Sequence, residues 1–124
     1  MRDYRKFYID GQWVDPAQPQ TLDVVNPATE GVAGVISLGS RADVDRAVAA
    51  AQRAFESYSQ TTREERVALL ERIVAVYQSR LGDMARAISE EMGAPLATIA
   101  TPLQAPAGLG HFMVALGILK DFEF

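Results

Sequence analysis

The amino-acid sequence predicts an α/β chain in which a β-hairpin and short strands precede two to three long helices. Asp10-Gly11 separates two β-prone runs, and a later β-branched run ends at Asn26-Pro27. From Ser40 onward, apolar residues recur at helical spacing instead. This change of period, from about two residues to about 3.6, divides the chain into a strand segment, residues 1–39, and a helical segment, residues 40–124.

Composition is that of an ordinary soluble protein and excludes several function classes. The 124 residues are 48% apolar and 23% charged, with a net charge of −4, so no basic stripe is present to neutralise nucleic-acid phosphates. The chain has no cysteine, which excludes disulfides and thiolate metal sites. The longest weakly polar run, Ala105 to Leu119, is too short to span a membrane. We therefore expect a cytoplasmic protein with no nucleic-acid or membrane partner.

The first predicted element is a β-hairpin. Lys6 to Ile9 and Gln12 to Val14 flank Asp10-Gly11. This dipeptide is typical of a type I′ turn, because both central residues of that turn need positive φ. A proline-containing loop follows the hairpin. The remaining predicted strands, in short and antiparallel-looking pieces, are Thr21 to Val25 and Val32 to Leu38.

The helical segment begins with two amphipathic helices. Ser40 and Asp43 form a capping-box pattern at the start of the first. The second is predicted to open at Thr61 or Thr62, each of which has a glutamate three residues on, and to end at Gly93. A span of about thirty residues is long for a globular helix, although an internal glycine weakens its middle.

Two prolines make the third predicted helix irregular. Pro102 suits the first helical position after Thr101, whereas the ring of Pro106 would clash with the carbonyl group of Pro102. The pattern predicts a kinked or late-starting helix from about Pro102 to Asp121. The chain stops at Asp121-Phe-Glu-Phe124 with no capping glycine and no polar tail, and Phe112, Met113, Leu116, Leu119, Phe122 and Phe124 make this end apolar. We therefore expect an interrupted chain whose end packs against a partner.

Several short motifs follow one another in a specific order, although each alone is weak. They are Phe-Tyr-Ile-Asp-Gly-Gln-Trp-Val at 7–14, Val-Val-Asn-Pro-Ala-Thr at 24–29, Asp-Val-Asp-Arg-Ala-Val-Ala-Ala-Ala-Gln-Arg-Ala-Phe at 43–55, Arg-Glu-Glu-Arg at 63–66 and Glu-Met-Gly at 91–93. In this order and spacing they resemble the opening of the NAD(P)-dependent aldehyde dehydrogenases. The chain departs from the family at Glu30-Gly31, where glycine more often precedes glutamate.

The resemblance implies a Rossmann-like α/β fold for the whole protein and a limited role for this part. Residues 1–39 would lie along the oligomerisation and cofactor domains, and residues 40–124 would form the helical part of the cofactor-binding domain. In the family a cysteine attacks the aldehyde, hydride passes to NAD or NADP, and a glutamate activates the hydrolytic water. These residues and the dinucleotide contacts have no counterpart here, so we expect no catalytic or cofactor-binding residue and no catalytic domain in this chain.

Two further family features imply candidate site residues. A monovalent cation would be held by the main-chain oxygens of Val24 and Val25 and the carboxylate of Glu91, since hard cations prefer oxygen ligands. The alternative is that the valines are strand core and Glu91 is a solvated charge. Gln104 and Gly108 fall at positions that line the substrate tunnel, although Gly108 suits helix packing equally well.

Two hypotheses of different class follow. The first is that the chain is the N-terminal fragment of an oxidoreductase that oxidises an aldehyde to a carboxylic acid with NAD or NADP, is inactive by itself, and belongs to a homo-oligomer, a dimer or tetramer. The alternative is a naturally short, non-catalytic interaction module derived from the same fold. The sole histidine, His111, is expected to be a packed or half-exposed side chain rather than a catalyst.

Overall fold

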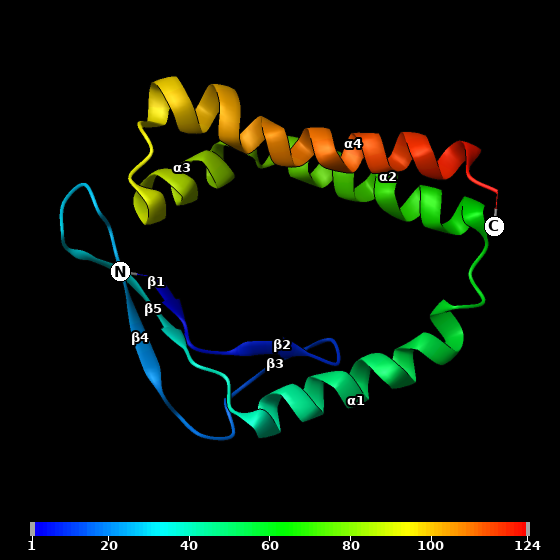
Figure 1. Cartoon of the computed structure of the whole chain (residues 1–124), viewed down its shortest axis with the longest axis horizontal. Helices are drawn as coiled ribbons and strands as arrows, with labels where there is room; N and C mark the ends of the chain where they lie inside the picture. The colour runs from blue at the N-terminus through cyan, green and yellow to red at the C-terminus, as the bar shows by residue number, and fades with distance from the viewer. Residues whose placement is uncertain (1, 124) are drawn as a thin grey trace. The chain divides into compact units, whose positions relative to one another are not determined.

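The structure, a computed structural model, describes residues 2–123 and confirms the predicted α/β class, with strands followed by helices (Figure 1). The chain divides into two compact units, residues 1–60 and residues 61–124. The first unit holds the five described strands and one helix. The second is entirely helical.

A three-stranded sheet forms part of the first unit. Its strands are β1 (Arg2–Tyr4), β4 (Thr21–Val25) and β5 (Val32–Ser37), in the spatial order β1-β5-β4. β4 and β5 confirm the two predicted strands, and they pair antiparallel. The pairing of β1 with β5 is parallel, so the prediction of antiparallel pieces is wrong for this strand. A side chain at Gly34 would lie 3.0 Å from the carbonyl oxygen of Arg2, so glycine permits this close approach.

The hairpin is formed by β2 (Phe7–Ile9) and β3 (Gln12–Val14), as predicted. Asp10 has φ 56° and Gly11 has φ 74°, the left-handed geometry that both central residues of a type I′ turn require. The facing rings of Tyr8 and Trp13 lie 5.2 Å apart between centroids. Cross-strand aromatic pairs of this kind stabilise a short hairpin.

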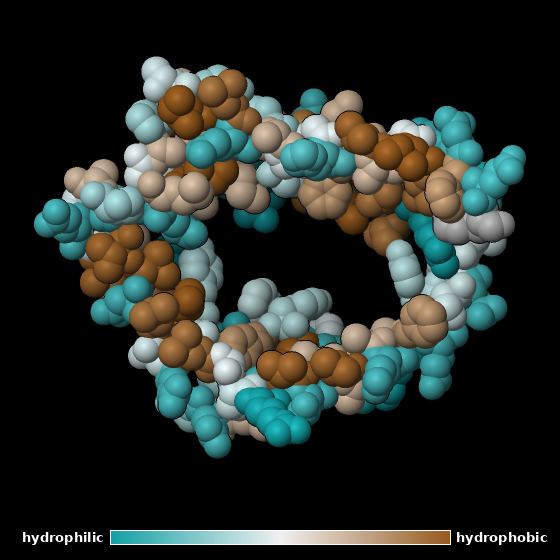
Figure 2. Space-filling view, in the orientation of Figure 1, coloured by the Kyte–Doolittle hydropathy of each residue, from teal (hydrophilic) through white to brown (hydrophobic). Residues whose placement is uncertain are grey.

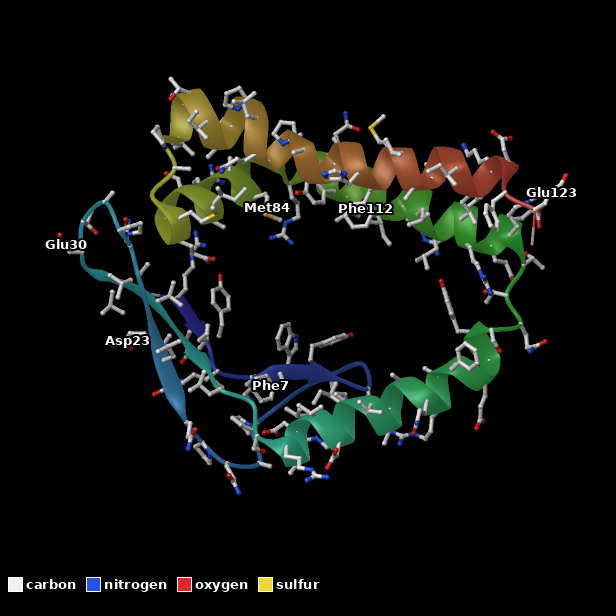
Figure 3. All side chains as sticks on the ribbon, in the orientation of Figure 1. Phe7, Asp23, Glu30, Met84, Phe112 and Glu123 are labelled. Carbon is white, nitrogen blue, oxygen red and sulfur yellow. The ribbon has the colours of Figure 1, made fainter. Side chains whose placement is uncertain are left out.

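The turn between β4 and β5 is organised by Asn26. Its backbone N–H donates to the carbonyl of Gly31 at 2.9 Å, and its own carbonyl accepts from the N–H of Glu30 at 2.8 Å. The Asn26 side-chain oxygen also accepts from the N–H of Ala28 at 2.9 Å. Glu30, at the tip of this connection (Figure 3), has φ 57°. The turn therefore places a side chain where glycine would be unstrained.

Replacing Glu30 with glycine is expected to raise the free energy of unfolding by up to about 1 kcal/mol, because the left-handed conformation costs a residue with Cβ roughly this amount. Glu30→Ala is the matched control, since it removes the carboxylate without relieving the backbone. Chemical denaturation of the variants measures the difference. Equal stability of the glycine and alanine variants would show that φ at this position carries no cost.

The helix of the first unit, α1 (Arg41–Tyr58), begins at the predicted cap. The carboxylate of Asp43 accepts hydrogen bonds from the N–H of Ser40 at 2.9 Å, the hydroxyl of Ser40 at 2.7 Å and the N–H of Ala17 at 2.8 Å. Asp43 is only 4% exposed and is the one buried charged residue among those described. It ties the loop after the hairpin to the start of α1.

The three donors around Asp43, the N–H of Ala17 first, hold the pKa of its carboxyl below the usual range. Because the folded-state pKa is lowered, this contribution to stability is present above the ordinary carboxyl pKa, about 3.9, and is lost as the pH falls through the folded value. Asp43→Asn is therefore expected to lower the thermal midpoint at neutral pH and to flatten its decline in acid.

Asp45→Asn is the control for this substitution, because Asp45 lies in the same helix with its side chain 71% exposed. Thermal midpoints followed by circular dichroism from neutral to acid pH make the comparison. If the two variants lose stability in parallel as the pH falls, the hydrogen bonds to Asp43 do not contribute as described.

The predicted second helix is two helices in the structure, α2 (Arg63–Ser79) and α3 (Leu81–Met92). The N-cap of α2 is Thr62, one of the two predicted start residues. The hydroxyl of Thr62 accepts from the N–H of Glu65 at 3.1 Å, and the Glu65 carboxylate accepts from the N–H of Thr62 at 2.8 Å. The end at Gly93, φ 71°, is also as predicted. The prediction of a single long helix is wrong, because the backbone leaves helical geometry at Arg80, with φ −113° and ψ 15°.

Local features explain the break. Gly82 follows it closely and has low helix propensity. The carboxylate of Asp83 accepts from the side chains of Arg80 at 3.3 Å and Arg86 at 2.5 Å, which favours a new helix start with an acidic first turn. These exposed pairs position the break more than they stabilise the fold.

The last helical run consists of a π-helix, η1 (Leu96–Gln104), followed directly by α4 (Ala105–Asp121). The regular α-helix starts late, as predicted, but helical backbone already begins at Leu96, so the predicted start at Pro102 is wrong. The N–H of Ala105 donates to the carbonyl of Ala100, five residues earlier. These wider turns accommodate Pro102 and Pro106, which lack the N–H that a regular helix would use.

η1 and α4 together, Leu96–Asp121, are the one helix among the described residues that is long and apolar enough to cross a membrane by length and composition. The run is longer than the sequence pattern predicts because the π-helix extends it. This is weak evidence for a membrane span, because the core helix of a larger soluble protein meets the same criterion.

Buried apolar side chains in the described residues are all small. Ala50 is buried in the first unit, and a cluster of Ala85, Ala100 and Ala105 forms the core of the second. Many large apolar side chains lie at the surface instead, as the space-filling view shows (Figure 2). Burial of apolar area is the main stabilising contribution in most domains, so each unit has a modest core of its own.

Candidate functional site

The predicted cation ligands come from two elements. Val24 and Val25 are the last residues of β4, where the pairing with β5 is irregular. Val24 is half-buried and Val25 is 49% exposed, so neither is core in this chain. Glu91 lies in the last turn of α3 and is exposed. Residues 2–123 contain no cluster of three or more side chains of the metal-binding types.

The predicted tunnel residues lie one helical turn apart. Gln104 ends η1, and Gly108 lies in the first turns of α4. The side-chain oxygen of Gln104 is buried and has no hydrogen-bond partner within the chain. An acceptor in this position favours a donor group or a water molecule beside it.

Gly108 lies directly against the ring of Tyr77 in α2. A Cβ at this position would overlap the Tyr77 hydroxyl and come within 2.9 Å of the ring carbon Cζ. The same ring packs against Phe112, with ring centroids 5.9 Å apart, and Figure 3 labels Phe112 on α4. Gly108 therefore packs closely against Tyr77, and its role in lining a tunnel stays a prediction.

Polar contacts at the far end of α4 fix its alignment with α2. Lys120 pairs with Glu71 at 3.0 Å, and the guanidinium of Arg63 donates to the carbonyl of Phe122 at 3.0 Å. Together with the Tyr77 contact, these interactions hold the two helices side by side (Figure 1). No motif in the sequence predicts this pairing of α2 with α4.

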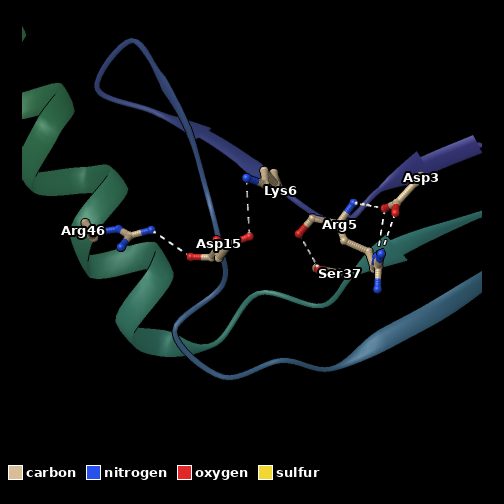
Figure 4. Close-up of polar contacts among 6 residues, drawn as sticks. All are labelled: Asp3, Arg5, Lys6, Asp15, Ser37 and Arg46. Atoms are coloured by element: carbon tan, nitrogen blue, oxygen red, sulfur yellow. Dashed lines mark hydrogen bonds and ion pairs between the residues drawn. The ribbon is translucent and has the colours of Figure 1, made fainter.

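Polar contacts in the first unit join the hairpin, the loop, the sheet and α1 (Figure 4). Asp15 accepts from Arg46 through its carbonyl at 3.3 Å, and its carboxylate lies 3.8 Å from the ammonium group of Lys6. The hydroxyl of Ser37 donates to the carbonyl of Arg5 at 2.6 Å. These contacts position the elements, and none pairs a nucleophile with a base.

The carboxyl groups whose pKa departs from its ordinary value all accept hydrogen bonds from neighbouring residues. Hydrogen bonds from Arg5 lower the pKa of Asp3, and hydrogen bonds from Arg80 and Arg86 lower that of Asp83. As at Asp43, each lowered pKa favours the ionised carboxylate. A general base near neutral pH would need a raised carboxyl pKa. His111 is exposed on α4, and the chain has no cysteine to act as a nucleophile.

The contacts described so far position strands and helices relative to their neighbours within each unit. Residues 13–121 match the sequence model of the aldehyde dehydrogenase family. The match covers most of the chain, and the chain belongs to the aldehyde dehydrogenase family.

Named relatives agree with this assignment. The chain is 56% identical over all 124 residues to 3-succinoylsemialdehyde-pyridine dehydrogenase from Pseudomonas sp, and 44% identical to a putative aldehyde dehydrogenase of Staphylococcus aureus. All of this chain is covered in both comparisons, but only 26% of each relative. The chain thus spans about a quarter of their length and corresponds to their N-terminal part.

Solved structures match equally well. An aldehyde dehydrogenase from Bartonella henselae superposes with a TM-score of 0.97 at 43% identity, covering 100% of this chain and 26% of that one. A mutant of aldehyde dehydrogenase C from Pseudomonas syringae, in complex with NAD⁺ and octanal, gives 0.93 at 45% identity over 97% of this chain and 24% of that one.

Proposed function

We propose that the chain is the N-terminal segment of an NAD(P)-dependent aldehyde dehydrogenase that oxidises an aldehyde to a carboxylic acid, and that this segment has no activity alone. The observation that carries the proposal is the superposition of the entire chain on a quarter of the Bartonella henselae enzyme. Related structures hold NAD⁺, which supports a dinucleotide as hydride acceptor, either NAD or NADP.

The proposed contribution of this segment is architectural. Residues 1–39 would run along the oligomerisation and cofactor domains, and residues 40–124 would supply helices of the cofactor-binding domain. The nucleophilic cysteine would come from the remaining length of such an enzyme, since this chain has none. We also propose a cytoplasmic location and a homo-oligomeric state, a dimer or tetramer, as the family resemblance implies.

Two site assignments are included as proposals. The main-chain oxygens of Val24 and Val25, with the carboxylate of Glu91, would contribute to a monovalent-cation site, which the irregular pairing of β4 supports. Gln104 and Gly108 would lie along the aldehyde passage, which the buried, unpartnered oxygen of Gln104 supports. Names of relatives and neighbours indicate a useful substrate panel: octanal and 3-succinoylsemialdehyde-pyridine.

The alternative, a naturally short interaction module, makes a different prediction for the gene. We expect the reading frame to continue past Phe124 and the intact mass of the native protein to exceed the 13.5 kDa of this chain. Mass spectrometry of the native protein and sequencing of the gene measure this. A stop codon after Phe124, with a native mass equal to that of this chain, favours the interaction module instead.

A further inference from the structure

Asp10-Gly11, the dipeptide at the tip of the hairpin, differs chemically from every other aspartate site in the chain. Each other aspartate is followed by a residue with a side chain, and the sole asparagine, Asn26, precedes a proline. Glycine has no Cβ, so its backbone nitrogen is the least hindered nucleophile for the side-chain carbonyl carbon of the residue before it. A proline nitrogen carries no hydrogen and cannot react in this way. Asp10 is therefore the one residue of the sequence placed for rearrangement of the main chain.

The turn leaves Asp10 and Gly11 open to solvent. The Asp10 side chain is 67% exposed, and a Cβ at Gly11 would meet nothing within 4 Å. The strands β2 and β3 form a sheet of their own, with three residues in each strand. A two-stranded hairpin of this size is only marginally stable by itself, so its tip opens readily. Water reaches the tip, and the backbone gains the freedom that ring closure needs.

One contact opposes a reaction between these two residues. The guanidinium of Arg53, on α1, donates to the carboxylate of Asp10 at 3.0 Å. Ring closure removes the negative charge of this carboxylate and brings its carbon atom to the nitrogen of Gly11. The ion pair with Arg53 must therefore break before the ring can close.

We propose that Asp10-Gly11 is a site of spontaneous isoaspartate formation and that Arg53 restrains the reaction. The carboxyl group of Asp10 takes up a proton, the nitrogen of Gly11 attacks Cγ, and one carboxyl oxygen leaves as water with the N–H hydrogen. The resulting five-membered imide then adds one water molecule. Attack on its main-chain carbonyl breaks the original peptide bond, so the chain runs through the former side chain and the α-carboxylate is free. Only water is exchanged, and the proposal does not depend on the proposed function.

The rearrangement has a defined structural consequence. It inserts one carbon atom into the main chain of the turn, whereas the pairing of Ile9 with Gln12 closes over two residues of ordinary length. The charged group also moves from the side chain to the α-carbon, away from Arg53. We expect the aromatic contact of Trp13 in the hairpin and the ion pair with α1 to be lost together.

Ageing of the chain in solution at neutral pH tests the proposal. Isoaspartate is quantified by enzymatic methylation of the free α-carboxylate and is located by fragmentation of the tryptic peptide 7–41 in a mass spectrometer. We expect isoaspartate at position 10 and none at Asp15 or Asp23, which lie in the same peptide. Arg53→Gln is expected to form it roughly two- to fivefold faster, the factor that corresponds to the loss of an exposed ion pair.

Arg41→Gln is the matched control, because Arg41 is also an exposed arginine of α1 and pairs with Asp45 in the same helix. It is expected to age like the native chain. The comparison is repeated in denaturant, where the folded ion pair is absent and the native chain and Arg53→Gln should react at the same rate. Fluorescence of Trp13, the sole tryptophan, and the thermal midpoint are measured on the modified fraction, and both are expected to show a loosened hairpin.

Gly11→Asn tests the nucleophile, since asparagine tolerates the left-handed conformation while its side chain shields the backbone nitrogen. Isoaspartate at position 10 is expected to form more slowly in this variant. Absence of isoaspartate at position 10 from both the native chain and Arg53→Gln overturns the site. Equal rates for these two proteins in the folded state, or a difference that persists in denaturant, overturn the role of Arg53.

Discussion

Replacing Gly108 with alanine is expected to lower the free energy of unfolding by about 1–2 kcal/mol, although alanine is the better helix former. The added Cβ would lie within 2.9 Å of Cζ of Tyr77, and the ring of Tyr77 is itself packed against Phe112. To admit the methyl group, α2 and α4 must separate or the ring must leave its contact. Chemical denaturation followed by circular dichroism measures the effect.

Two other glycines of α4 provide the controls. A Cβ at Gly110 or Gly117 meets nothing within 4 Å, so alanine at either position is expected to stabilise the chain by roughly 0.5–1 kcal/mol. The double variant Tyr77→Ala, Gly108→Ala should recover part of the loss relative to Tyr77→Ala alone. Stabilisation by Gly108→Ala equal to that by Gly110→Ala would rule out close packing at this point.

The isolated chain is expected to oxidise no aldehyde and to bind no dinucleotide. The family chemistry needs a cysteine nucleophile, and this chain has none. Incubation with octanal and either NAD or NADP, followed through the absorbance of the reduced cofactor, should match a buffer blank. Calorimetric titration with NAD should give no saturable heat.

A complete dehydrogenase assayed in parallel with octanal and NAD is the positive control. Turnover above the blank would mean that the chain contains a nucleophile other than cysteine. Saturable binding of NAD at micromolar concentration would mean that dinucleotide contacts lie within this segment.

Local signals account for the elements that the sequence predicts well. Asp10-Gly11 determines its hairpin because two adjacent residues with positive φ suffice to define the turn. Thr62 with Glu65 and the left-handed Gly93 likewise define helix ends within a few residues. Each of these features is independent of what the rest of the chain does.

Elements that depend on distant residues were missed. β1 is a strand only because β5 lies beside it, and three residues with no apolar pattern give no signal of their own. The break at Arg80 falls within a continuous apolar periodicity, and such a periodicity predicts one helix. The prolines predict an irregular helix near Pro102. They do not predict that the helix begins at Leu96 with the wider turns of a π-helix.

The candidate site was only partly accessible from sequence. Gln104 and Gly108 were identified through resemblance to a family, not through their own chemistry. The contact of Gly108 with Tyr77 joins two helices whose pairing is set by tertiary packing. A glycine inside an apolar helix is the one signal that suggests a close approach in advance, and it does not name the partner.

Activity of a fusion protein tests the central claim most directly, namely that this chain is a structural segment of an aldehyde dehydrogenase. The chain replaces the matching quarter of the Bartonella henselae enzyme, with which it shares 43% identity, and the fusion is assayed with NAD and an aldehyde that the parent enzyme oxidises. We expect aldehyde-dependent reduction of NAD within roughly tenfold of the parent, a barrier difference of at most about 1.4 kcal/mol. A fusion that folds and assembles like the parent but oxidises no aldehyde would contradict the account.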